Sequence, residues 1–179
     1  MQTVKMVITG PFSAGKTQFI RTISEIDVIS TERKISSEAE RVKEATTVAM
    51  DFGRITVDED LVLYLFGTPG QRRFDFMWEI LSEGMLGFIV LIDSVRSETF
   101  REAKHILEIF RSYAPTPYVV AANKQDLPDA WSPEDLRIAL KIDPHIKVLP
   151  CVSTDRDQVK GVLLELLYSI LEHMEEGAA

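Results

Sequence analysis

The sequence predicts an α/β fold in a single domain, residues 1–179, built on a mostly parallel six-stranded sheet with one antiparallel edge strand and helices on both faces. Short apolar runs alternate along the chain with segments of helical periodicity, which is typical of parallel strands linked by helices. A hairpin pattern joins one pair of strands. The 179 residues, 45% of them hydrophobic, indicate a domain that buries a sizeable core without disulfides or a structural metal.

The strands are expected, in chain order, at residues 4–8, 48–57, 61–66, 86–92, 118–122 and 146–152. The runs at 86–92 and 118–122 are continuously apolar and the run at 4–8 is apolar apart from Lys5, which indicates strands that are covered on both faces. The acidic turn 58–60 joins the second strand to the third as a hairpin, and this hairpin supplies the antiparallel edge.

Helices are expected at residues 16–24, 74–81, 97–113 and 157–174, with one more that begins after residue 132. That last helix has a clear start signal, because Ser132 can cap it and Pro133 suits its first position. The polar segment 25–46 has weak periodicity and is predicted to be a loop with some helix.

Charge and composition narrow the classes of partner. The chain has 28 acidic and 20 basic residues, a net charge of −8, which disfavours nucleic acid and anionic lipid as partners. Cys151 is the single cysteine, cannot form an internal disulfide, and is expected to be a small buried residue rather than a nucleophile. No pattern of a signal peptide, lipid anchor or membrane span is present, so we expect a cytoplasmic protein with no direct membrane anchor.

The strongest motif is Gly10-Pro11-Phe12-Ser13-Ala14-Gly15-Lys16-Thr17, which lies between a predicted strand and a predicted helix. It fits the phosphate-binding pattern G-x-x-x-x-G-K-[ST]. Its glycines allow backbone N–H groups to wrap a phosphate closely, and the helix points its positive end at the same place. Lys16 supplies charge to the β- and γ-phosphates and Thr17 can ligate Mg²⁺, so the expected cofactors are a nucleotide and Mg²⁺.

A second motif, Asn123-Lys124-Gln125-Asp126, follows the predicted strand 118–122. The Asp126 carboxylate can accept two hydrogen bonds from the N1–H and 2-amino groups of guanine, a donor pair that adenine lacks. Asn123 can tie neighbouring loops together, and the stem of Lys124 can cover one face of the base. The pair of motifs therefore predicts GTP or GDP as the ligand.

With these motifs the chain resembles the Ras-like small GTPases over nearly its whole length, so the expected domain is a P-loop GTPase domain. The segment Ala-Ala-Asn-Lys-Gln-Asp-Leu-Pro at 121–128 is especially similar to the Arf branch. The switch sequence Thr68-Pro69-Gly70-Gln71 resembles prokaryotic Ras-like GTPases of the MglA type, whose partners are roadblock-domain proteins.

The resemblance implies a role for further residues. Thr47 would close over Mg²⁺ and the γ-phosphate, the Gly70 N–H would sense the γ-phosphate, and Gln71 would orient the attacking water. Ser153 and Thr154 would form the last guanine-contacting loop. The switch regions, around 30–47 and 67–82, would be ordered by GTP and released on hydrolysis.

Two departures from the family pattern concern the part of the expected site that would hold the phosphates and Mg²⁺. Gly67 stands where the family has an Mg²⁺-holding Asp, so Mg²⁺ is either held more weakly or held by a substitute acid, Asp51 or Asp75. Phe12 stands where Ras proteins have glycine, so it either slows hydrolysis or turns outward onto the switch residues.

Side chains near the switches have two interpretations each. The arginines are either an intrinsic catalytic finger or solvated surface charges: Arg33, Arg41, Arg54, Arg72 and Arg73. The apolar residues are either partner anchors or core, about half of each: Phe74, Phe76, Met77 and Trp78.

Three functions fit these motifs. The first is a GTP-hydrolysing switch that controls protein effectors, aided by an activating partner. The second is a nucleotide-binding interaction module with little turnover, which Gly67 and Phe12 favour. The third, an ATP-dependent kinase or ATPase, leaves Asn123-Lys124-Gln125-Asp126 unexplained.

Overall fold

The computed structural model describes residues 1–30, 50–70 and 74–178. Within these ranges the strands are β1 (Gln2–Thr9), β2 (Ile29–Ser30), β3 (Asp51–Asp58), β4 (Leu61–Gly67), β5 (Gly87–Asp93), β6 (Tyr118–Asn123) and β7 (Val148–Pro150). The helices are α1 (Lys16–Ile23), α3 (Phe76–Ser82), α4 (Phe100–Tyr113), α5 (Pro133–Ala139) and α6 (Arg156–Ala178), with a 3₁₀ turn at Ser97–Thr99.

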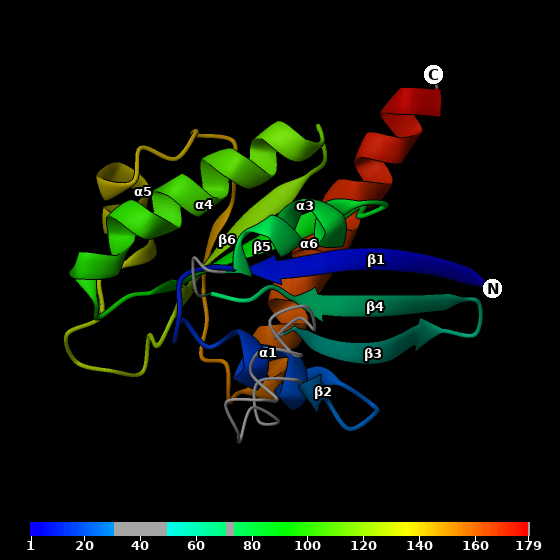
Figure 1. The fold of residues 1–179 in the computed structure, drawn as a ribbon, viewed down its shortest axis with the longest axis horizontal. Helices are drawn as coiled ribbons and strands as arrows, with labels where there is room; N and C mark the ends of the chain where they lie inside the picture. Colours follow the sequence, from blue (N-terminus) through cyan, green and yellow to red (C-terminus); the bar gives the residue numbers. More distant parts are fainter. Residues whose placement is uncertain (31–49, 71–73, 179) are drawn as a thin grey trace, which may run out of the picture.

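The sheet confirms the predicted α/β class. Its strand order is β2-β3-β4-β1-β5-β6-β7, and β4, β1, β5, β6 and β7 all run parallel. Strand β3 runs antiparallel to β4, as the hairpin pattern predicts, and the opposite directions of these two arrows are visible in Figure 1. All six expected strands are present. Residues 48 and 49 of the second expected strand lie outside the described ranges, and the other strand ends differ by a few residues.

A seventh strand, β2, extends the antiparallel edge. Ile29 and Ser30 pair with Phe52 and Asp51 of β3, inside the segment 25–46 that was expected to be a loop with some helix. The strand could not be predicted because two residues are too few to show a period.

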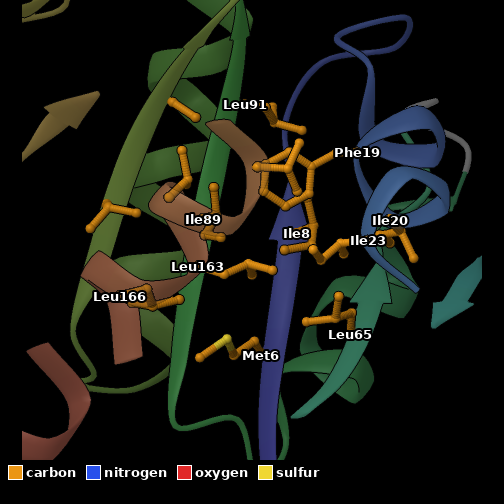
Figure 2. Close-up of a cluster of buried hydrophobic side chains, with 14 of the residues drawn as sticks. Met6, Ile8, Phe19, Ile20, Ile23, Leu65, Ile89, Leu91, Leu163 and Leu166 are labelled. Atoms are coloured by element: carbon orange, nitrogen blue, oxygen red, sulfur yellow. The ribbon is translucent and has the colours of Figure 1, made fainter. Parts of the chain in front are cut away.

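Helices cover both faces of the sheet and enclose two cores. Helices α1 and α6 lie on one face, where Figure 2 shows Met6 and Ile8 of β1 packed among side chains such as Phe19 and Leu163. Helices α3, α4 and α5 lie on the other face, where Val7 of β1 joins the second core. Because neighbouring residues of a strand point to opposite faces, the consecutive apolar residues Met6, Val7 and Ile8 are what a strand between two helix layers requires.

One edge of the sheet gathers the loops that carry the motifs. The parallel strands all end at this edge, and β3 begins there because it runs the other way. The loops after β1, β4, β6 and β7 therefore meet although they are far apart in sequence. This edge is where open α/β sheets bind their ligands. Within the described residues, no helix is both long enough and apolar enough to span a bilayer.

Candidate nucleotide-binding site

The Gly10–Lys16 loop has the backbone geometry that its glycines predict. Strand β1 ends at Thr9 and α1 begins at Lys16, which confirms the strand–loop–helix context. Gly10 and Gly15 have φ values of +146° and +106°, in the region that favours glycine. A Cβ atom at Gly10 would lie 2.3 Å from the Leu91 carbonyl oxygen, and one at Gly15 would lie 2.4 Å from the Asn123 side-chain nitrogen.

Lys16 places its charge inside this loop. Its side chain is buried, and Nζ donates hydrogen bonds to the carbonyl oxygens of Gly10 and Pro11, both at 2.8 Å. A lysine ammonium is a compact positive charge, and this one lies in the loop where the motif predicts a bound phosphate.

Two adjoining hollows lie along the loop. The phosphate-side pocket has a volume of about 330 Å³, and its lining residues are Phe12, Ser13, Gly15, Lys16, Thr17, Gln18, Arg21, Asp51, Thr68 and Gly70. The base-side pocket has a volume of about 190 Å³, and its lining residues are Gly15, Gln18, Asn123, Lys124, Asp126, Leu127, Val152, Ser153 and Thr154. The pockets share Gly15 and Gln18, so the hollows beside the two predicted motifs adjoin each other.

Asn123 joins three loops, as its place in the motif predicts. Its buried side chain donates from Nδ2 to the Ala14 carbonyl at 2.8 Å. Its Oδ1 accepts from the Ser153 N–H at 3.0 Å. One amide therefore positions the P-loop and the 153–154 loop relative to each other.

Lys124 lines the base-side pocket and is held by an acid that was not among the predicted site residues. Its Nζ donates to Asp93 Oδ2 at 2.6 Å and to the Ser13 carbonyl at 3.3 Å. Asp93 is buried at the carboxyl end of β5, where it also accepts from the Val95 N–H at 3.1 Å. An acid at the end of a continuously apolar strand was the available signal, since that is the ligand-binding edge.

Hydrogen bonds and ring packing hold the rest of the Asn123–Asp126 loop in place. Gln125 Nε2 donates to Ser94 Oγ at 3.0 Å and to the Trp131 carbonyl at 2.8 Å. The Trp131 ring packs edge-on against Phe100 at the start of α4, with 5.1 Å between ring centroids. Asp126 is exposed and lines the base-side pocket.

The segment after β4 lies directly against the P-loop. A Cβ atom at Gly70 would lie 2.6 Å from Phe12 Cα and 2.8 Å from Lys16 Nζ, so this close approach requires glycine. Trp78 Nε1 donates to the Pro69 carbonyl at 2.9 Å and anchors the segment to α3. The expectation that about half of the apolar residues are core is confirmed: Phe74 and Trp78 are buried, Phe76 is exposed and Met77 is partly exposed.

Phe12 and Arg21 complete the rim of the phosphate-side pocket. Phe12 lines the pocket and is 53% exposed. Arg21 was missed by the sequence reasoning, although its position four residues after Thr17 places it on the same face of α1. Arg54 is exposed on β3 and is not among the described residues that line the pocket.

Several predicted site residues lie outside the described ranges, and their predicted roles stay predictions. They are Thr47 and Gln71, with the arginines Arg33, Arg41, Arg72 and Arg73.

Thr17 and Asp51 meet at the inner wall of the phosphate-side pocket. Thr17 Oγ1 donates to Asp51 Oδ2 at 2.5 Å. No cluster of three or more His, Cys, Asp or Glu that could cage a metal occurs among the residues described. This donor set suits Mg²⁺, which takes one or two protein oxygens and completes its shell with phosphates and water.

A glycine loop between strand and helix, joined through Asn123 to a base-side loop, defines a nucleotide-binding P-loop protein related to small GTPases. The chain belongs to the family described as "Conserved hypothetical ATP binding protein", whose model matches residues 27–173. The matched range begins after the Gly10–Thr17 motif and includes the base loop.

Individual relatives agree with this class. An uncharacterized protein of Methanocaldococcus jannaschii is 32% identical over 95% of this chain and 96% of its own length. The mutual gliding-motility protein MglA of Myxococcus xanthus is 29% identical over 76% of this chain and 74% of its own length. Human ADP-ribosylation factor-like protein 4C is 28% identical over 71% of this chain, and the match spans 63% of that relative.

Proposed function

We propose that this protein is a guanine-nucleotide-dependent molecular switch that hydrolyses GTP to GDP and thereby controls protein partners. The observation that carries the proposal is the base-side pocket, which Asp126 lines beside Asn123 and which adjoins the P-loop pocket at Gly15. The site thus offers a cradle for phosphates and, next to it, a carboxylate for the base.

Guanine fits this pocket better than adenine. The carboxylate of Asp126 is an acceptor-only group, and guanine presents two adjacent donors, N1–H and the 2-amino group. Adenine has no such pair, so its ring would leave the carboxylate without hydrogen bonds. This chemistry is our reason to favour GTP over ATP, although the family description names ATP.

We expect Asp126→Asn to exchange guanine specificity for xanthine specificity. An amide presents one acceptor and one donor, which match the N1–H and the 2-oxo group of xanthine. Loss of the charge-assisted pair should weaken GDP binding about 100-fold. Fluorescence titration with guanine, xanthine and adenine nucleotides measures the three affinities.

The matched control is Asp129→Asn, which removes another exposed acid of the same loop that is not among the described pocket-lining residues. Its affinities should equal those of the wild type. Tighter binding of ATP than of GTP by the wild-type protein would refute the assignment of the base.

The proposed switch function rests on the segment that lies against the P-loop. Gly70 is close enough to Phe12 and Lys16 to respond to a γ-phosphate, and Trp78 links the segment to α3. The Thr68-Pro69-Gly70-Gln71 sequence resembles MglA-type GTPases, so we propose protein effectors and an activating partner, with roadblock-domain proteins as the class to test.

A second candidate function is a nucleotide-binding module with little turnover. Phe12 favours it, because this residue lines the phosphate-side pocket and a bulky side chain beside the γ-phosphate can obstruct the geometry of phosphoryl transfer. Single-turnover measurements of phosphate release separate the two functions.

We expect slow but complete release of one phosphate per bound GTP, faster release by Phe12→Gly, and none by Gln71→Ala. The reason is that phosphoryl transfer depends on positioning the water and the γ-phosphate. Absence of phosphate release, both alone and with a roadblock-type partner, would favour the interaction module.

A further inference from the structure

The position of Asp51 relative to Gly67 points to a function for this buried acid. The antiparallel register of β3 and β4 sets the two residues directly opposite each other. Asp51 is the first residue of β3 and Gly67 the last of β4, so both lie at the ligand-binding edge of the sheet.

The Asp51 side chain fills the space that a side chain at position 67 would use. A Cβ atom built on Gly67 would lie 3.2 Å from Asp51 Cβ and 3.3 Å from Asp51 Oδ2. It would also lie 2.9 Å from the Ile20 Cδ1 atom. The glycine of β4 and the acid of β3 therefore form a matched pair, in which a carboxylate reaches the same place from the neighbouring strand.

This carboxylate is buried and only partly satisfied. Asp51 is 5% exposed, and within the described ranges its Oδ1 atom has no hydrogen-bond partner. A buried acceptor without a partner costs free energy, and a buried charge costs more unless a cation lies near it. Asp51 is also the acidic residue among the described residues that line the phosphate-side pocket.

The hydrogen bond from Thr17 adds a second observation. Its hydroxyl gives its single proton to Asp51 Oδ2, which leaves the oxygen lone pairs of Thr17 available to a cation. The carboxylate thus orients the hydroxyl that the P-loop motif assigns to Mg²⁺.

We propose that Asp51 is the acid that holds Mg²⁺ at this site, in the place of the Asp that is absent from position 67. This inference rests on the proposed binding of a nucleotide, because the phosphates would supply the remaining charge. Asp75, the other candidate acid, is exposed just before α3 and is not among the described residues that line the pocket.

The test measures how fast a fluorescent GDP leaves the protein at different concentrations of free Mg²⁺. Mg²⁺ is expected to slow GDP release. For Asp51→Asn we expect the free Mg²⁺ concentration that gives half of this effect to rise about 10- to 100-fold. In EDTA the variant should release GDP no faster than the wild type, because the removed charge repels the phosphates when no cation is present. A merely structural role would speed release equally in both conditions, and that result would overturn the proposal.

Two further variants sharpen the test. Asp75→Asn should keep the wild-type Mg²⁺ dependence, and a shift as large as that of Asp51→Asn would overturn the assignment. The double variant Asp51→Gly with Gly67→Asp returns the carboxylate to β4 and should recover most of the Mg²⁺ dependence that Asp51→Gly loses.

A measurement on the unaltered protein needs no variant. With Mn²⁺ in place of Mg²⁺ and GDP bound, the ¹³C carboxyl resonance of Asp51 should broaden beyond detection, and its persistence would overturn the proposal. If the protein binds GDP but none of these changes alters its Mg²⁺ dependence, the role of Asp51 is refuted and the proposed function is not. A protein that binds no guanine nucleotide refutes the proposed function instead.

Discussion

At this site, the identity of single residues is constrained mainly by how closely atoms of neighbouring loops approach them. Gly15 is required because the Asn123 amide occupies the space of a side chain, and Gly70 is required because the P-loop backbone does. Cys151 shows a different constraint, because burial makes its thiol hard to ionise. Burial raises the pKa of its thiol to about 12, an effect that the Ser153 hydroxyl partly offsets and the nearby Asp155 charge reinforces.

We expect native Cys151 to be inert to thiol reagents at pH 8 and reactive in denaturant. The thiolate is the nucleophile, and a raised pKa leaves almost none of it. Stability also follows: the unfolded thiol loses its proton near pH 9 while the folded one keeps it to about 12, so this contribution falls as pH rises between these values. Denaturation midpoints measured from pH 8 upward test this.

The control is Cys151→Ala, which cannot titrate at this position. Its midpoint should fall less steeply above pH 9 than that of the wild type, and parallel curves for both proteins would contradict the assigned pKa.

At the scale of elements, capping residues decide where a helix begins, and strand register decides which side chains point into the site. Helix α5 begins as predicted: Ser132 Oγ accepts from the Asp135 N–H at 3.1 Å, and Pro133 is its first residue. Strand β3 shows the effect of register, because a shift of one residue would turn Asp51 away from the site.

We expect Ser132→Ala to lower the free energy of unfolding by about 1 kcal/mol, because the N–H of Asp135 loses its cap. Urea denaturation measures the change. Ser112→Ala is the matched control, since this exposed hydroxyl donates only to the Ile109 carbonyl within α4 and caps no helix start. Equal losses in the two variants would show that the cap contributes nothing.

On the scale of the whole molecule, an acidic protein can bind an anionic ligand through one local site. The chain carries a net charge of −8, yet the Gly10–Lys16 loop combines a helix start with the Lys16 ammonium. The sheet brings this loop beside the base loop, which is more than one hundred residues away in sequence, as the Asn123–Ala14 hydrogen bond shows.

The sequence predicted those features whose physical cause lies within a few neighbouring residues. The apolar run at 4–8 indicates a strand between two helix layers, and the Gly10–Thr17 motif indicates a phosphate-binding loop, because both patterns are read within one segment. Ser132 with Pro133 likewise marks a helix start. Strand β2 was not predicted for the same reason. Its two residues form a strand only through pairing with β3, which is distant in sequence.

The sequence by itself determined the fold class, the phosphate loop and the base motif of this protein, because each is encoded by the spacing of nearby residues. Only the tertiary structure decided that Asp51 faces Gly67, that Asp93 holds Lys124, and that Arg21 lines the pocket. These pairings depend on strand order, register and helix placement, which bring distant segments together and which no single segment specifies.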